Sequence, residues 1–217
     1  MLIQDYLRRL MHYLKANGLS KTAIHALEVG KRNIFQNRFI IFYADIATIK
    51  DKEIKLPDSW TVECKQQQGD IKEIDLNRLL SSWNKTIKNR QIRERFDKGA
   101  ILWFLKINNE LAAFKWTIRK KPVKPYFFPL TDCDVHVFDA FVFPEFRGKN
   151  INAFLTKYVF FELKKDNTIR AFAEVHAWNK QELNSIQKSG FIRLSSARKF
   201  HFFGRNVTIW SIMPKGH

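Results

Sequence analysis

The sequence feature that most constrains the fold is an apolar segment, a short polar turn and an amphipathic segment in direct succession. Residues 135–143 form an apolar run of strand length, VHVFDAFVF, which is typical of a buried strand. Residues 151–163 repeat apolar side chains every three or four positions, which predicts a helix with one buried face. A further strand is predicted over residues 171–175. This order of strand, helix and strand indicates an α/β layered domain with a mixed sheet.

Segments with strand or helix patterns surround this unit. Asn108, Asn109 and Glu110 separate two apolar runs, which is a signal for a tight hairpin. Asp75 is expected to cap one helix, and another helix is expected to end near Gly99. The remaining predicted strands cover residues 39–43, 60–64, 101–107, 111–118, 191–203 and 207–213, and a further helix covers residues 180–189.

The N-terminal part has a different character, and we expect the chain to divide near residue 50. Residues 1–50 then form a helical and strand extension packed on the core, and residues 51–217 form the main domain. Within the extension, a helical apolar stripe is opposed by basic residues such as Arg8 and Arg9. Such a basic amphipathic helix either packs against the domain or lies on an anionic membrane surface.

Export and membrane insertion find no support in the sequence. There is no apolar run of roughly 18 residues, and the first residues lack the layout of a secretory signal. Two cysteines, Cys64 and Cys133, are too few for a disulfide framework or a metal cluster. We therefore expect a cytoplasmic protein without a metal, with the inner face of the membrane as a location for the basic helices.

The formal net charge of +17 bears on partners rather than on the fold. Such a field attracts nucleic acid, anionic lipid or a multiply phosphorylated cofactor. The basic residues are spread along the chain, which is typical of a solvated surface. The sequence also lacks the interleaved aromatic and basic residues of an RNA-binding platform, which argues against nucleic acid as the partner.

The turn between the apolar strand and the following helix has the chemistry of an anion site. It reads PEFRGKNIN over residues 144–152. The free N–H groups of a first helical turn and the helix dipole favour negative charge. Arg147 and Lys149 add full positive charges, and Gly148 allows close approach of the backbone. A pyrophosphate is the ligand that this turn predicts.

This turn resembles motif A of the GNAT acyltransferase superfamily, whose usual form is Arg/Gln-x-x-Gly-x-Gly/Ala. Arg147 fits the first position, and Pro144-Glu145-Phe146 fits the common lead-in. Asn150 and Asn152 stand where the two later glycines usually are. Asparagine tolerates the left-handed backbone that glycine adopts there.

A second resemblance lies nearer the C-terminus. In GNAT proteins a strand ends in Asn, and the next helix closes in Gly-Phe. Asn179 and Gly190-Phe191 reproduce that spacing after the strand predicted over residues 171–175. The resemblance implies a GNAT-like acyl-CoA N-acyltransferase fold with an N-terminal helical extension.

The resemblance also implies the reaction. Acetyl-CoA, or another acyl-CoA, lies between two splayed parallel strands, and an amine attacks the thioester directly. Backbone groups of the first strand bind the pantetheine and polarise the carbonyl. The residues implied to bind the coenzyme are Phe141, Val142, Phe143, Arg147, Gly148, Lys149, Asn150, Ile151, Asn152 and Asn179.

The attacking amine must be neutral, so a general base is needed. Asp139 is the first candidate, because a carboxylate in an apolar strand has a tunable pKa; a salt bridge across the sheet is the alternative. His136 is the next candidate, although a lone histidine on a strand is often structural, and Glu174 and His176 follow it.

The general acid is also open. Many relatives carry a tyrosine that protonates the leaving thiolate, and here Ile186 occupies its position. The acid is therefore absent, replaced or unnecessary, and Tyr158 and Ser185 are the other side chains to consider.

The acceptor is less defined. The overall pattern resembles bacterial GNAT proteins associated with surface-polysaccharide assembly, which implies a small amine such as an amino sugar, and nucleotide-linked forms would suit the basic surface. A peptide or protein amine is an alternative acceptor. A basic GNAT-like module that binds nucleic acid or membrane without catalysis is another alternative. The sequence leaves open whether the protein forms an oligomer.

Overall fold

A computed structural model describes residues 37–49, 54–81, 85–120, 122–123, 126–202 and 205–212 of the 217-residue chain, together with residues 18, 20, 22 and 24. The helical stripe that we expect in the N-terminal extension lies almost wholly outside these residues. Its packing or membrane role therefore stays a prediction. None of the described helices is long and apolar enough to cross a membrane.

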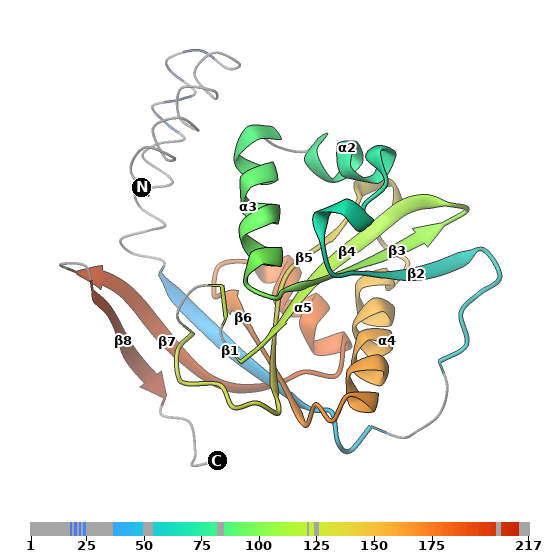
Figure 1. Cartoon of the computed structure of the whole chain (residues 1–217). Helices are drawn as coiled ribbons and strands as arrows, with labels where there is room; N and C mark the ends of the chain where they lie inside the picture. The colour runs from blue at the N-terminus through green and yellow to red at the C-terminus, as the bar shows by residue number, and fades with distance from the viewer. Residues whose placement is uncertain are drawn as a thin grey trace.

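Eight strands form one mixed sheet in the order β2-β3-β4-β5-β6-β1-β7-β8 (Figure 1). Every neighbouring pair is antiparallel except β5 and β6, which are parallel. This confirms the α/β mixed sheet that the sequence predicts. The strands are β1 (Arg38–Asp45), β2 (Trp60–Lys65), β3 (Ile101–Ile107), β4 (Glu110–Arg119), β5 (Asp134–Val142), β6 (Arg170–His176), β7 (Ile192–Phe202) and β8 (Arg205–Ile212).

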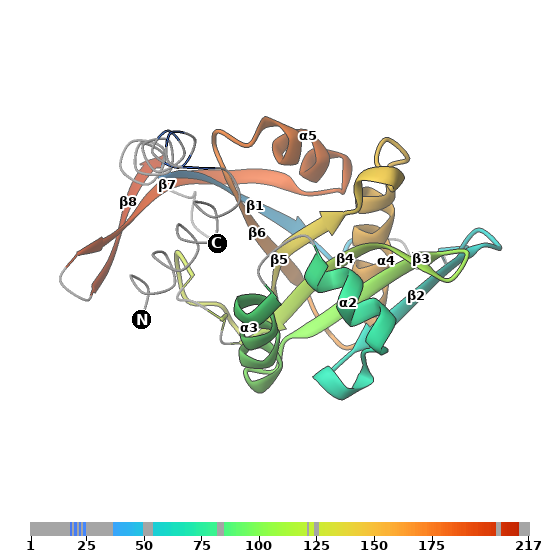
Figure 2. The ribbon, with the colours of Figure 1, turned by 90° about the horizontal axis from the view of Figure 1, so that it is seen from above.

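Helices cover both faces of the sheet (Figure 2). One face carries α2 (Glu73–Ser81) and α3 (Lys85–Asp97), and the other carries α4 (Ile151–Lys165) and α5 (Lys180–Lys188). Short 3-10 turns, η1 (Gln68–Asp70) and η2 (Pro144–Phe146), follow β2 and β5. The sheet is therefore the middle layer of three.

The alternation of side chains along the strands divides the core in two. Val135 and Val137 of β5 pack with Leu155 of α4 in one cluster. Trp116 of β4 packs with Leu79 of α2 in the other. Successive strand residues point to opposite faces, so His136, between the two valines, lies on the α2–α3 face.

The strand expected over residues 39–43 is confirmed as β1, and it lies inside the sheet. It pairs antiparallel with both β6 and β7, so that Phe39 stands opposite His176 on one side and Ala197 on the other. Ile41 and Phe42 are almost wholly buried, as expected for a strand covered on both faces. The N-terminal extension thus contributes a strand to the sheet itself.

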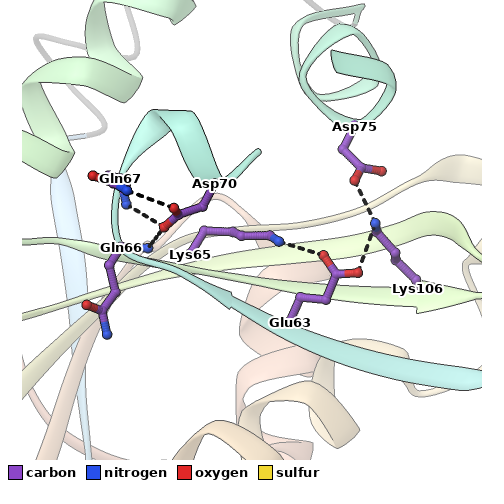
Figure 3. Close-up of polar contacts among 7 residues, drawn as sticks. All are labelled: Glu63, Lys65, Gln66, Gln67, Asp70, Asp75 and Lys106. Atoms are coloured by element: carbon purple, nitrogen blue, oxygen red, sulfur yellow. Dashed lines mark hydrogen bonds and ion pairs between the residues drawn. The ribbon is translucent and has the colours of Figure 1, made fainter. Parts of the chain in front are cut away.

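The cap expected from Asp75 is wrong. Helix α2 begins at Glu73, and Asp75 is buried in its first turn. Its carboxylate accepts a hydrogen bond of 2.6 Å from Nζ of Lys106 on β3, which also contacts Glu63 at 3.0 Å (Figure 3). A buried ammonium needs paired carboxylates, and this need determines where Asp75 points.

Candidate active site

Strands β5 and β6 pair at one end and part at the other. Their register contains three pairs, ending with His136 opposite Phe172. Arg170 closes the paired end, because its Nε and a terminal nitrogen donate to the two oxygens of Asp134 at 2.8 and 3.1 Å. Beyond His136, β5 stays with β4 and β6 stays with β1. The gap that opens is the splay that the resemblance implies.

A bulge in β5 contributes to this parting. Phe138 pairs with Trp116 of β4, but the next pair is Phe141 with Phe114. One extra residue on β5 is accommodated there, and Asp139 adopts a left-handed φ of 50°. A bulge bends its strand and leaves backbone groups without a ladder partner. The bend therefore falls where the strands separate.

A groove of about 450 Å³ lies between the β5–α4 turn and α5. Gln181, Asn184, Ser185 and Lys188 of α5 line it on one side. Two of the implied coenzyme residues, Phe143 and Lys149, are not among its lining residues, and Phe143 is buried against the α2–α3 core. The other eight line it: Phe141, Val142, Arg147, Gly148, Asn150, Ile151, Asn152 and Asn179.

The turn before α4 keeps its amides available. Gly148 has a φ of 82° and Asn150 a φ of 53°, so Asn150 holds the left-handed backbone that we expect. For Asn152 that expectation is wrong, because it lies within α4 and has no positive φ. No side chain caps α4, and the first-turn N–H groups of a helix have no partner within the helix. Arg147 and Lys188 add positive charge to the same groove. This end of the groove is suited to phosphate.

Two asparagines shape the walls of the groove. Nδ2 of Asn152 donates to Oγ of Ser185 at 2.8 Å and so links α4 to α5. Asn179 caps α5: its Oδ1 accepts from the Glu182 amide at 3.2 Å, and its Nδ2 donates to the Glu182 carboxylate at 2.8 Å. Asn152 thus binds a neighbouring helix, and the groove beside it stays open.

A smaller cavity of about 90 Å³ lies between the parted strands. Val137 and Ala173 line it from the α4–α5 face. Phe138 and Glu174, the next residue on each strand, line it from the other face. Ala140, Asn152 and Glu182 line both this inner cavity and the groove. A ligand in the groove can therefore reach through the sheet toward the α2–α3 face.

The structure brings together two candidate bases. Nε2 of His136 lies 2.8 Å from Oε2 of Glu174, across the point where β5 and β6 part. His136 is buried and its ring stacks on Phe138. Nδ1 of His136 is buried without a hydrogen-bond partner. Because a carboxylate only accepts, the hydrogen of the neutral ring lies on Nε2.

Asp139 does not have the surroundings that we expect. Its side chain is 57% exposed and pairs with Arg95 of α3 at 2.7 Å. The bulge turns it out of the apolar run, so the expectation of a desolvated carboxylate is wrong. The alternative, a salt bridge, is confirmed, but its partner Arg95 lies on helix α3 and not across the sheet. Asp139 still lines the inner cavity.

Two ionisable residues at this site, the buried Lys115 and the half-buried Glu182, were not predicted. Lys115 of β4 is 3% exposed, lines the inner cavity, and its Nζ donates to Oγ1 of Thr156 on α4. Burial lowers the pKa of Lys115 to about 7, against a smaller opposing effect of Glu182. Burial, and after it the charge of Asp139, raises the pKa of Glu182. A lysine within the apolar run ELAAFKWTI was the available sequence signal.

Comparisons with known proteins bear on the fold. No family model and no curated protein matches the sequence. An acetyltransferase of the GNAT family from Colwellia psychrerythraea superposes with a TM-score of 0.53, at 8% identity over 72% of this chain and 52% of that chain. A tandem GNAT protein from the clavulanic acid biosynthesis pathway gives a TM-score of 0.53, at 13% identity over 79% and 55%.

A third solved structure is AAC(6')-Ib in complex with paromomycin and acetyl-CoA. It gives a TM-score of 0.50, at 12% identity over 70% of this chain and 92% of that chain. The aligned region spans about half the length of the first two structures. Together with the splayed parallel strands and the uncapped helix, these likenesses show that the chain has the fold of the GNAT acyl-CoA N-acyltransferases.

Proposed function

We propose that the protein is an acyl-CoA-dependent N-acyltransferase that moves an acetyl group from acetyl-CoA to an amine. The observation that carries this proposal is the groove that begins at the uncapped N-terminus of α4 and continues into the gap between β5 and β6. The end of the groove at α4 is suited to the pyrophosphate of an acyl-CoA. The small cavity at the other end is suited to its thioester.

The donor has a natural orientation in this groove. Its pyrophosphate binds the amides after Gly148, with Arg147 and Lys188 beside it. Its thioester reaches the inner cavity, where the bulge leaves Ala140 without a register partner on β4. A backbone N–H at the bulge then polarises the thioester carbonyl. This placement needs no covalent acyl-enzyme.

The acceptor amine approaches from the α2–α3 face. There the paired side chains of His136 and Glu174 are positioned to take its proton, directly or through water. Asp139 is the second candidate, because it lines the same cavity while engaged with Arg95. We favour the His136–Glu174 pair over Asp139 as the general base, because its two side chains come from the two strands that border the gap.

For the acceptor we propose a small amine, with an amino sugar, free or nucleotide-linked, as the first class to test. Two aromatic rings, those of Tyr126 and Phe138, contact His136 of the proposed base. A third, that of Trp178, is 41% exposed and stacks on His176 at the end of β6. Aromatic faces of this kind pack well against the apolar face of a sugar ring. A cytoplasmic location, with the basic N-terminus at the membrane, completes the proposal.

An acceptor screen tests this function. Purified protein is incubated with acetyl-CoA and either amino sugars, nucleotide-linked amino sugars or peptides with a free N-terminus, and release of coenzyme A thiol is followed. We expect release with an amino sugar and none without acceptor. Turnover with peptides and not with amino sugars would show that the acceptor is a peptide or protein amine. Salt-sensitive nucleic acid binding without affinity for coenzyme A would favour the non-catalytic alternative.

A further inference from the structure

Two lysines are buried on neighbouring strands, and only one of them is paired. Lys106 of β3 is 4% exposed and holds Asp75 and Glu63 (Figure 3). Burial alone would lower the pKa of Lys106, but the hydrogen bonds with the two carboxylates outweigh it and raise the pKa. Lys115 of β4 makes no ion pair with any described residue, and its one hydrogen bond is to Thr156.

Lys115 lies beside the place where the thioester is proposed to sit. The register pairs that flank it, Phe114 with Phe141 and Trp116 with Phe138, are the two that enclose the bulge. Thr156 donates its own hydroxyl hydrogen to the Asn152 carbonyl at 2.7 Å. Its oxygen therefore accepts from the Lys115 ammonium and holds it at the inner cavity.

The charged groups around Lys115 come from three elements. Asp139 of β5, Glu174 of β6 and Glu182 of α5 line the same cavity, whereas α4 contributes only the neutral Asn152 and Thr156. None of the three carboxylates is in hydrogen-bond contact with Nζ of Lys115. Burial lowers the pKa of Lys115 to about 7, and the charge of Glu182 favours the ammonium form to a smaller extent.

This inference rests on the proposed function. We propose that Lys115 is the general acid of the transfer, and that its ammonium gives a proton to the coenzyme A sulfur as the thioester breaks. The amine nitrogen forms the new C–N bond and loses its proton to the His136–Glu174 pair. The C–S bond breaks, the sulfur takes the Lys115 proton, and Lys115 regains one from solvent through the groove.

The arrangement explains how this chain manages without a donor on α5. Ile186, at the position where relatives carry a tyrosine, lines the inner cavity but has no proton to give. Ser185 lines the groove but not the inner cavity, and Tyr158 lines neither of them. Lys115 enters the same space from β4. Base and acid then lie on opposite faces of the sheet, with the gap between the strands joining them.

An acid is needed because a thiol has a pKa of about 8.5, so a departing thiolate is unstable at neutral pH unless it is protonated or stabilised by charge. A buried ammonium provides both effects, since low polarity strengthens its attraction for the sulfur anion. The same attraction lowers the pKa of the thiol in the bound product, coenzyme A. This property can be measured without knowing the acceptor.

The test is the pH titration of the thiolate ultraviolet absorbance of bound coenzyme A. It compares wild type with Lys115→Met. Lys157→Met, at an exposed position of α4 outside both cavities, serves as the control. We expect the thiol of bound coenzyme A to have a pKa about one pH unit lower in the wild-type complex than in the Lys115→Met complex, and the Lys157→Met curve to match that of wild type. Coincident curves for wild type and Lys115→Met would overturn the proposal.

Two further measurements keep the test decisive. If Lys115→Met does not fold, Lys115→Gln is used in its place, because the glutamine amide can still donate a hydrogen bond to Thr156. In wild type alone, the bound thiol must ionise at lower pH than the thiol of free coenzyme A, and equal or higher values would overturn the proposal. Calorimetry on the same samples separates the two claims: loss of all coenzyme A binding contradicts the proposed function, whereas binding with an unshifted thiol contradicts only the role of Lys115.

Discussion

His136 on β5 and Glu174 on β6 are held 2.8 Å apart, nitrogen to oxygen, across the point where the two parallel strands separate. Each side chain comes from a different wall of the gap, so the pair exists only because the strands are still close at His136. It faces the side of the sheet opposite the groove that we assign to the coenzyme. This position suits the role that we propose for the pair, as proton acceptor for an amine that attacks from that side.

Replacing Glu174 tests this pair. For Glu174→Gln we expect turnover to fall about a hundredfold or more, because the histidine loses its anionic partner, with the affinity for acetyl-CoA unchanged. Steady-state thiol release and calorimetry measure the two quantities. Asp139→Asn is the matched comparison, since it removes a carboxylate that lines the same cavity. If Asp139→Asn abolishes turnover and Glu174→Gln does not, Asp139 is the base.

Removing the charge at the phosphate end has a different expected effect. Arg147→Ala should weaken binding of coenzyme A about tenfold, the size of one charge-assisted hydrogen bond at an exposed site, and leave the free energy of unfolding unchanged. Lys165→Ala, at the far end of α4, is the control and should leave affinity as it is. Equal affinities of wild type and Arg147→Ala would remove this turn from the binding site.

Eight of the ten residues predicted for the coenzyme line one groove, because the sequence signal there is local. Gly148, Asn150 and Asn152 lie within five residues, and the strand–turn–helix order determines which way their amides face. The expectation for Asp139 failed because one extra residue in β5 turns its side chain outward, and alternation of apolar residues does not reveal a bulge. Asp75 was misjudged because its partner, Lys106, is thirty-one residues away.

The pairing of His136 with Glu174 needed the register of two strands that are separated by a helix. Both residues were candidates, but no pattern in the sequence placed them together. Lys115 was visible as a charge in an apolar run, but the role that we propose for it depends on Thr156 of α4 and Glu182 of α5. Side-chain clusters assembled from several elements therefore lie beyond what periodicity predicts.

Stability should depend on pH through Lys115. The folded state releases this proton at a pKa of about 7, whereas the unfolded state keeps it up to a pKa of about 10.4. The unfolded state binds more protons between these values, so the free energy of unfolding rises with pH in that window, by up to about 1.4 kcal/mol per pH unit. Urea unfolding of wild type and Lys115→Met at several pH values measures this slope. Identical slopes would show that Lys115 is charged in the fold.

Replacing Lys106, the paired buried lysine, should destabilise the fold. Lys106→Met leaves the buried carboxylate of Asp75 without its partner, whereas Glu63 keeps Lys65 at 2.9 Å, and loss of one member of a buried ion pair costs about 3 kcal/mol or more. Chemical unfolding at neutral pH gives this value. Adding Asp75→Asn to Lys106→Met should recover part of the loss. If Lys106→Met is as stable as wild type, water already screens the charges of Lys106 and its carboxylate partners.

The most direct test of the central claim is a calorimetric titration of the protein with acetyl-CoA. The amides before α4 and the gap between β5 and β6 predict a saturable site of one acetyl-CoA per chain, with an affinity that decreases in Arg147→Ala. Binding of this kind would also raise the melting temperature, because the ligand binds only the folded state. No heat of binding and no thermal stabilisation at millimolar acetyl-CoA would contradict the assignment of this groove to a coenzyme.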